Sequence, residues 1–185
     1  MPNSRGVLLY GPPAAGKDTI TSQLVTIGPY AHFQRLKVGP GRTSGYRMGT
    51  VEQLATLRKH GQVIYENRRY DSTYVVDRSE LDAILHEQER VPVLHVGQVD
   101  AIRAIRRGYP LTWTVVMVFC PREEAEKRLI GRHDARVDER LAVWDETLTE
   151  ARRADPALFD LVLNTDSFEP THTAAAIDWC QRHHL

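Results

Sequence analysis

The segment 11–19 reads GPPAAGKDT and carries the residue types from which proteins build a cradle for phosphate groups. Its two glycines and Lys17 match the pattern G-x-x-x-x-G-K-[ST], except that Asp18 stands where the pattern has a hydroxyl. In such a loop the backbone N–H groups, the start of the next helix and the lysine ammonium surround a di- or triphosphate. A Gly/Pro-rich turn before an ordinary helix is the alternative. We predict a phosphate site made by Gly11, Pro12, Pro13, Ala14, Ala15, Gly16, Lys17, Asp18 and Thr19.

Asp18 is the unusual residue of this loop. A carboxylate is a strong ligand for a hard cation, but without the cation it repels bound phosphates. One interpretation is therefore a metal site formed by Asp18 and Thr19. The other is an acid favoured by the dipole at a helix start, with Thr19 supplying the hydroxyl one position late.

Short apolar runs supply the framework that must hold this loop. Runs of this length are typical of strands that are buried on both faces. Between them lie patterns typical of amphipathic helices. The alternation predicts an α/β fold, with a five-stranded parallel sheet and helices on both of its faces. The five runs are 6–11, 33–38, 91–97, 113–120 and 159–165.

Residues 39–77 interrupt this alternation. The stretch begins with a segment rich in glycine and basic residues, continues as a helix that Gly61 closes, and ends as a strand, a turn and a strand. We predict that it forms a small lobe within a single domain that spans residues 1–185.

Composition argues against several classes of protein. The chain has 24 Lys plus Arg and 24 Asp plus Glu, and its pI is about 7.1, so no overall charge attracts it to nucleic acid or to an anionic membrane. Cys120 and Cys180 belong to no disulfide or zinc pattern. The N-terminal apolar run is too short for a signal sequence or a membrane span. We expect a cytoplasmic protein.

The order of the motifs resembles the guanylate kinase family of nucleoside-monophosphate kinases. The phosphate loop is followed by KVGPGRTSGY, QVIYENRRYDSTY, EEAEKRLIGR, DERL and LVLNTD, in the order in which that family carries similar segments. The resemblance implies a P-loop kinase that uses ATP and Mg²⁺, with an arginine lid and an acceptor-binding lobe at 39–77. It implies a small phosphorylated molecule as acceptor. Monomer and homodimer both remain open.

The resemblance also implies roles for individual residues. The lid would span 128–140, and its arginines Arg128, Arg132 and Arg140 would neutralise the transferred phosphoryl group together with Lys17, while Asp18 would act in catalysis through the metal. Asn164 would lie beside the adenine. A solvated helix with paired charges is the alternative for the lid, and a solvated strand face is the alternative for the lobe. The residues expected around the acceptor are Lys37, Arg42, Tyr46, Arg47, Glu66, Tyr70, Tyr74, His95 and Gln98.

The third sheet strand departs from the family pattern. Guanylate kinases end it with Asp-x-Asp, but here His95 and Gly97 stand in those positions and Asp100 lies beyond. The combination of Lys-Asp in the loop with no Asp pair on the strand resembles the pattern of the ribose 1,5-bisphosphate phosphokinase branch of this superfamily. His95 could bind the acceptor, accept a proton near neutral pH or be a core histidine.

The leading functional hypothesis is a kinase with a nucleoside monophosphate similar to GMP as acceptor, followed by a sugar phosphate. A phosphotransferase acting on a hydroxyl of a natural product is an alternative, with Asp18, Asp71 or Asp77 as the base. A non-catalytic binding module is a third. The intact glycines and Lys17 favour an enzyme over a module.

Overall fold

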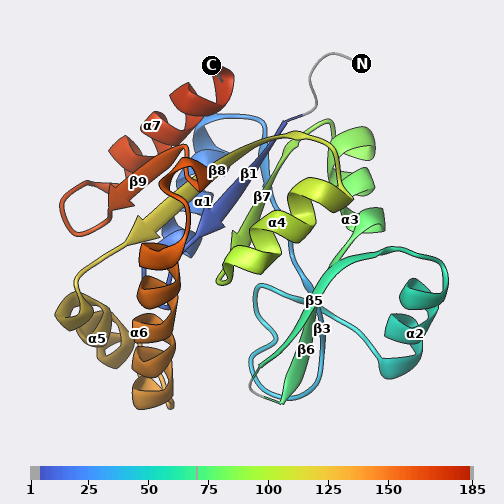
Figure 1. Cartoon of the computed structure of the whole chain (residues 1–185), viewed down its shortest axis with the longest axis horizontal. Coiled ribbons are helices and arrows are strands. Elements are labelled where there is room, and N and C mark those ends of the chain that lie inside the picture. The colour runs from blue at the N-terminus through green and yellow to red at the C-terminus, as the bar shows by residue number, and fades with distance from the viewer. Residues whose placement is uncertain (1–4, 70, 184–185) are drawn as a thin grey trace.

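The computed structural model describes residues 5–69 and 71–183 (Figure 1). Its main sheet has five parallel strands in the order β2-β7-β1-β8-β9. Consecutive buried residues line the two central strands, β1 and β8, as expected for strands covered on both faces. The predicted five-stranded parallel sheet is confirmed. The strands are β1 (Arg5–Tyr10), β2 (Tyr30–His32), β7 (Val91–Val96), β8 (Thr112–Phe119) and β9 (Leu161–Asn164).

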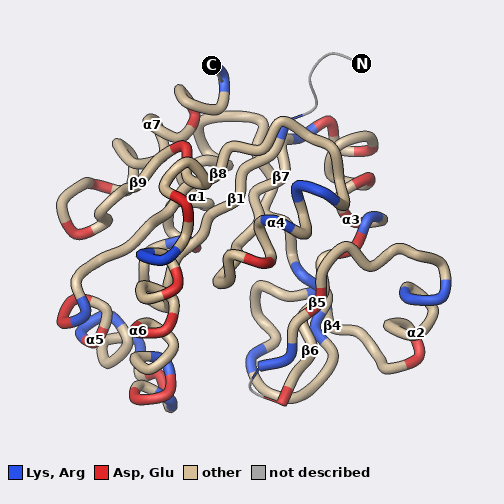
Figure 2. The backbone as a smooth tube through the Cα atoms, in the orientation of Figure 1, with Lys and Arg blue, Asp and Glu red and all other residues tan. Residues whose placement is uncertain are grey.

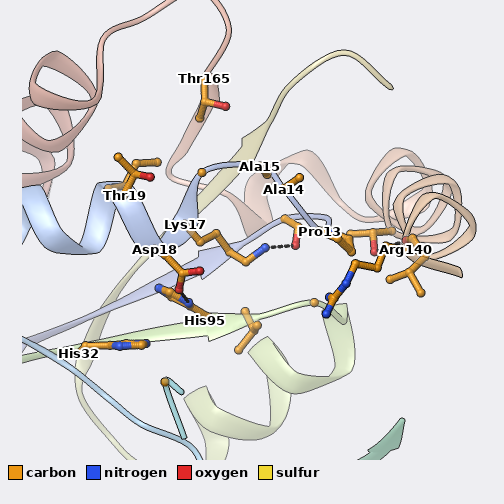
Figure 3. Close-up of a pocket in the computed structure, with 18 of the residues that line it drawn as sticks. Pro13, Ala14, Ala15, Lys17, Asp18, Thr19, His32, His95, Arg140 and Thr165 are labelled. Atoms are coloured by element: carbon orange, nitrogen blue, oxygen red, sulfur yellow. Dashed lines mark hydrogen bonds and ion pairs between the residues drawn. The ribbon is translucent and has the colours of Figure 1, made fainter. Parts of the chain in front are cut away.

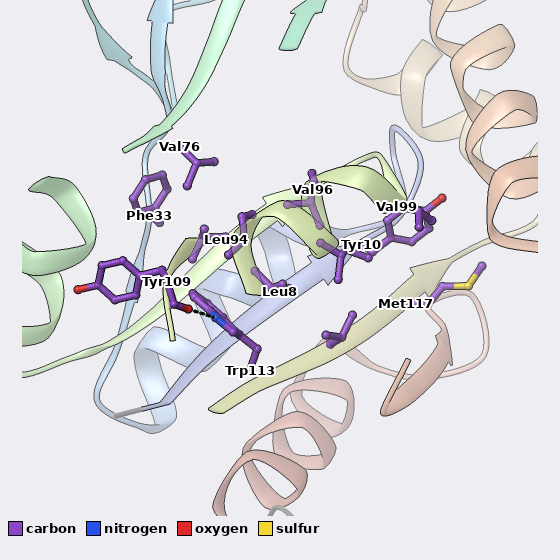
Figure 4. Close-up of a cluster of buried hydrophobic side chains, with 14 of the residues drawn as sticks. Leu8, Tyr10, Phe33, Val76, Leu94, Val96, Val99, Tyr109, Trp113 and Met117 are labelled. Carbon is purple, nitrogen blue, oxygen red and sulfur yellow. Dashed lines mark hydrogen bonds between the residues drawn. The ribbon is translucent and has the colours of Figure 1, made fainter. Parts of the chain in front are cut away.

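Helices cover the sheet on both faces. Val7 and Leu9 of β1 pack toward α1 and α7, whereas Leu8 and Tyr10 belong to a second cluster that includes residues of α4 and α6. Figure 4 shows this second cluster. The alternation follows from the two-residue period of a strand. The helices are α1 (Lys17–Ile27), α2 (Val51–Lys59), α3 (Arg78–Asp82), α4 (Val99–Gly108), α5 (Arg122–Gly131), α6 (Val137–Arg153) and α7 (Pro170–Arg182), with a π-helix η1 (Ala83–Glu87) and a 3₁₀-helix η2 (Pro156–Leu158).

A second, four-stranded sheet forms the small lobe. Its order is β4-β3-β6-β5, with β3 antiparallel to β6 and β6 antiparallel to β5. A capping box at Thr50 starts α2, which packs on this sheet through Leu54. The strands are β3 (Leu36–Val38), β4 (Arg47–Met48), β5 (Val63–Arg69) and β6 (Ser72–Asp77).

One strand predicted from the sequence lies in the other sheet. The run 33–38 was expected to be the second strand of the main sheet, but that position belongs to β2, and Leu36–Val38 is β3 of the lobe. The buried Phe33 still packs in the main core, whereas Leu36 packs with Leu54 and Val75. The chain therefore passes from one core to the other within this run.

Helices α5 and α6, which with the turn between them contain the predicted lid 128–140, pack against each other beside the carboxyl ends of β1 and β8 (Figure 1). Cys120, Ala125, Leu129 and Leu141 form the small core between them. Acidic and basic residues are interspersed along both the lid and the lobe (Figure 2). No helix in residues 5–69 and 71–183 is both long and apolar enough to span a membrane.

A partly buried ion-pair cluster at the base of the lobe extends to α3. Arg47 of β4 contacts Asp77, whose side chain is fully buried, and its Nε lies 3.1 Å from Glu80. Asp77 also accepts hydrogen bonds from the Ser79 hydroxyl and the Glu80 amide, which starts α3. Arg47 thus fixes the base of the lobe.

We predict that Arg47→Ala lowers the free energy of unfolding by about 3 kcal/mol, because it leaves the buried Asp77 carboxylate without its cation. Urea unfolding monitored by circular dichroism measures this loss. Arg58→Ala is the matched control: it breaks the exposed pair with Glu66 and should cost less than about 1 kcal/mol. Equal losses in the two variants would contradict the assignment.

Candidate active site

The segment that the sequence predicts to be a phosphate loop connects β1 to α1, the setting expected for such a loop. A Cβ on Gly11 would lie 2.1 Å from the Val118 carbonyl oxygen of β8, so only glycine fits there. Gly16, with φ of 85°, is left-handed and turns the chain into α1. Ala14 also has a positive φ, of 61°. The resulting turn directs the start of α1 toward the carboxyl ends of the central strands.

Lys17 lies at the base of this loop (Figure 3). Its Nζ donates hydrogen bonds to the carbonyl oxygens of Gly11, at 2.6 Å, and Pro12, at 2.7 Å. Burial lowers the pKa of Lys17 to about 8, with the neighbouring Asp18 acting in the opposite direction. Desolvation therefore destabilises the charged ammonium in this position, where a bound phosphate would stabilise it.

A cavity of about 480 Å³ opens in front of the loop. The loop, the end of β7, the lobe and the lid all contribute to its walls. Among the described residues that line it, Asp18 is the one carboxylate, and it faces seven basic side chains. These are Lys17, Arg35, Arg42, Arg69, Arg128, Arg132 and Arg140.

The three lid arginines expected from the sequence all line this cavity. Arg128 donates to the Ala14 carbonyl oxygen of the loop at 3.3 Å and to the Thr165 hydroxyl at 3.0 Å, and its Nε lies 2.8 Å from Glu124. It therefore connects α5 to the phosphate loop and to the segment after β9.

Asp134 holds the other two lid arginines. Its Oδ2 lies 3.1 Å from Arg132 Nη2 and 2.7 Å from Arg140 Nε. Burial alone would raise the pKa of Asp134, but the Arg136 amide and the Arg140 guanidinium lower it below its ordinary value. Sequence reasoning missed Asp134, although an acid within the arginine-rich GRHDAR was a usable signal.

Three predicted acceptor residues line the lobe side of the cavity: Arg42, Tyr46 and Tyr74. The rings of Tyr46 and Tyr74 lie 5.3 Å apart. Arg35, which the sequence analysis missed, also lines the cavity, and its guanidinium lies 5.1 Å from the centre of the Tyr74 ring. Arg35 was overlooked because it lies in the run that was assigned to the main sheet.

Arg69 links the lobe to helix α6 through an ion pair. It lies at the end of β5, and its Nη2 is 3.2 Å from Glu146 Oε2 of α6. Because Arg69 also lines the cavity, this ion pair closes one side of it.

Other predicted acceptor residues do not line the cavity. Lys37 is 2% exposed and donates to the carbonyl oxygens of Pro40, at 2.6 Å, and Arg42, at 2.8 Å, so it shapes the loop that carries Arg42. Arg47 pairs with Asp77, as described above. Glu66 pairs with Arg58 at 2.9 Å on the lobe surface. Tyr70 lies outside the described residues.

Asn164, the expected adenine neighbour, is engaged in the turn that follows β9. Its Nδ2 donates to the Ser167 hydroxyl and its Oδ1 accepts from the Asp166 amide, both at 3.0 Å. Thr165 and Phe168 line the cavity in this region, and the Phe168 side chain is exposed. A flat, exposed aromatic ring at this point offers a stacking surface for a base.

His95 and Gln98 line the cavity at the end of β7, as predicted. Gln98 accepts a hydrogen bond from the Tyr65 hydroxyl of the lobe at 2.8 Å. His95 Nε2 lies 2.7 Å from Thr21 Oγ1, and its Nδ1 lies 3.6 Å from Asp18 Oδ1. The ring of His32 lies beside it, with the two ring centres 4.5 Å apart.

The loop offers oxygen ligands for Mg²⁺. Asp18 and Thr19 are both exposed at the cavity wall, and carboxylate and hydroxyl oxygens are ligands that this hard cation accepts. Within residues 5–69 and 71–183 no group of three or more His, Cys, Asp or Glu side chains could hold a metal ion by itself. The donor set therefore fits a cation that phosphate oxygens also coordinate.

Only one of the three aspartates considered as a base for a hydroxyl acceptor faces the cavity. Asp77 is buried against Arg47, and Asp71 lies in the turn between β5 and β6. Asp18 remains.

Comparison with known proteins identifies the fold. No protein-family model matches the chain, and no curated protein sequence matches it. A guanylate kinase from Anaplasma phagocytophilum superposes with a TM-score of 0.68 at 14% identity, covering 100% of this chain and 87% of that one. A sugar kinase from Janibacter sp. superposes with a TM-score of 0.55 at 14% identity, covering 95% and 94%. The chain therefore has a guanylate kinase-like fold.

The buried histidines predict a loss of stability in acid. Burial, followed by the charges of His32 and Lys17, keeps the pKa of His95 well below its ordinary value, and burial also lowers that of His32. The unfolded chain protonates both near pH 6.5, so below that pH it binds more protons than the folded chain. The free energy of unfolding should then fall by up to about 1.4 kcal/mol per pH unit from His95, and further in the same direction from His32.

Urea unfolding at pH 7.5, 6.5 and 5.5 measures this slope. The double variant His32→Gln, His95→Gln should show a shallower decline than the wild type between pH 6.5 and 5.5. The exposed His86→Gln serves as the control and should keep the wild-type slope. Parallel curves for the wild type and the double variant would refute the prediction.

Proposed function

We propose that this protein is a phosphotransferase that moves the γ-phosphate of MgATP to a small, phosphorylated acceptor. The observation that carries the proposal is the cavity in which phosphate loop, lid and lobe meet, with seven basic side chains and one carboxylate among its described lining residues. Two kinases with the same fold support it.

The balance of charge favours two anionic ligands in this cavity. Four of the basic residues have carboxylate partners: Arg69, Arg128, Arg132 and Arg140. No ion pair to a carboxylate is found in the described part of the chain for Lys17, Arg35 or Arg42. Like charges brought together in a partly desolvated cavity repel, and bound phosphate groups relieve that repulsion.

Each part of the cavity has a role in this reaction. The loop amides and Lys17 hold the β- and γ-phosphates of ATP. Mg²⁺, held by Asp18, Thr19 and phosphate oxygens, would neutralise negative charge on the phosphates. Arg128, Arg132 and Arg140 stabilise charge on the transferred group, and closure of lid and lobe excludes water that would otherwise hydrolyse ATP.

An acceptor that is already a phosphate ester needs no strong base. Its attacking phosphate oxygen is ionised at neutral pH, so positioning and charge neutralisation suffice. Arg35, which precedes β3, and Arg42 of the lobe both line the cavity, and we assign them to binding of this acceptor.

The lining of the lobe favours a sugar phosphate over a guanine nucleotide. A guanine base presents donors, including its amino group, that a carboxylate would recognise. Glu66, expected for that role, is paired with Arg58 instead, and no described lobe residue on the cavity wall is acidic. Ser44, Asn67 and Gln98 offer hydroxyl and amide groups that suit sugar hydroxyls.

A coupled assay of ADP release tests the proposed function. With MgATP, we expect turnover of a sugar mono- or bisphosphate, slower turnover of GMP or AMP, and little with unphosphorylated hydroxyl acceptors. Lys17→Ala should lower kcat at least about 100-fold, because an ammonium at the transferred phosphate is lost. Absence of both nucleotide binding and turnover would leave a non-catalytic module as the better description.

Substituting Arg35 tests the acceptor site. Arg35→Gln should raise the KM for the phosphorylated acceptor about 10- to 100-fold and leave the KM for ATP nearly unchanged, because one charge-assisted hydrogen bond is lost. Arg68→Gln is the matched control, since Arg68 of β5 is exposed and does not line the cavity. If both variants keep the wild-type KM, Arg35 does not contact the acceptor.

A further inference from the structure

Three side chains form a short chain of contacts at the edge of the cavity. Asp18 and Thr21 lie three positions apart on α1, so they share one face of the helix. His95, near the end of β7, reaches both of them: its Nε2 is 2.7 Å from Thr21 Oγ1, and its Nδ1 is 3.6 Å from Asp18 Oδ1. Figure 3 shows the Asp18 carboxylate directed at the His95 ring.

The chemistry of a neutral imidazole sets the direction of the protons. One nitrogen carries hydrogen and the other accepts. If Thr21 donates its hydroxyl proton to Nε2, then Nδ1 carries the hydrogen and presents it to Asp18. The opposite tautomer would aim a nitrogen lone pair at the carboxylate, which repels it. The contacts therefore favour the order Thr21 to His95 to Asp18.

The surroundings fix the ring of His95 while Asp18 stays accessible. Thr21 is 3% exposed, and the His95 side chain is 14% exposed. The His32 ring packs on that of His95. The Asp18 side chain, by contrast, is 66% exposed on the cavity wall, so it can rotate unless a neighbour restrains it.

We propose that His95 is a positioning residue, held by Thr21, that orients the Asp18 carboxylate toward the cation accompanying a bound nucleoside triphosphate. Groups that attract a metal ligand restrict its orientation and so strengthen cation binding. His95 Nδ1 lies 3.6 Å from Asp18 Oδ1, beyond hydrogen-bond length, so this attraction is electrostatic. This inference rests on the proposed function, because it requires that the loop binds MgATP.

Binding of ATP measured by calorimetry, without and with increasing Mg²⁺, tests the proposal without any need for turnover. His95→Asn keeps an N–H near the position of Nδ1, whereas His95→Gln extends its amide toward Thr21. Thr21→Val removes the hydroxyl at nearly constant volume. Thr26→Val is the matched control, because Thr26 is exposed on the same helix and its hydroxyl donates to the Ser22 carbonyl oxygen of that helix.

His95→Gln and Thr21→Val should each raise the Mg²⁺ concentration that half-saturates the gain in ATP affinity by about tenfold. The half-saturating Mg²⁺ concentration of His95→Asn should be closer to that of the wild type, and that of Thr26→Val should equal it. The affinity for ATP without Mg²⁺ should be unchanged in all four variants. Melting temperatures of the unliganded variants monitor the fold separately.

The outcomes separate this inference from the proposed function. If the wild type binds no nucleotide, both are wrong. If the wild type binds MgATP and His95→Gln keeps its Mg²⁺ requirement, this inference alone is wrong. Equal shifts in His95→Asn and His95→Gln, or a parallel loss of metal-free ATP binding, would show that His95 only supports the fold, which also overturns it.

Discussion

Repulsion among the basic residues of one cavity is the constraint on which the site depends. These cations come from segments far apart in the sequence, and each is held by contacts that leave its charge near the cavity. Lys17 bonds to loop carbonyl oxygens, Asp134 bridges Arg132 and Arg140, and Arg128 contacts the phosphate loop. The packed sheet and its two helical layers supply the stability that this crowding opposes.

The order of the strands explains why these segments meet. β1 is central, with β7 and β8 as neighbours, so the loop 11–19, His95 and the start of α5 all lie at the carboxyl ends of adjacent parallel strands. Parallel sheets bind ligands at this edge. Asp18 of the loop and His95 of β7 are therefore neighbours in space. The unusual acid of the loop thus lies beside the histidine that replaces an acid on the strand.

Local patterns predicted much of this architecture, and long-range partners account for what they missed. The strand-loop-helix setting of residues 11–19 and the parallel sheet follow from spacing and periodicity within short segments, whereas the three arginines that line the cavity from α5, α6 and the turn between them were expected from the family resemblance. β2 was not predicted, because its three residues are too few to show the two-residue period of a strand. The run 33–38 was predicted as one strand, although it passes from one hydrophobic core to the other. Lys37 and Glu66 have the charges expected of ligands, but Lys37 is bound to the carbonyl oxygens of Pro40 and Arg42 and Glu66 is paired with Arg58, and a sequence does not reveal such partners.

Calorimetric titration with inorganic tripolyphosphate tests the central claim most directly, because this probe has the charge of the ATP phosphates without base or sugar. The account predicts one binding site, from which ATP displaces the probe. The affinity for tripolyphosphate should fall steeply as the salt concentration rises from about 50 to about 300 mM, because salt screens the attraction between the charges. No binding, or binding that ATP does not displace, would contradict the claim that the cavity exists to hold phosphate.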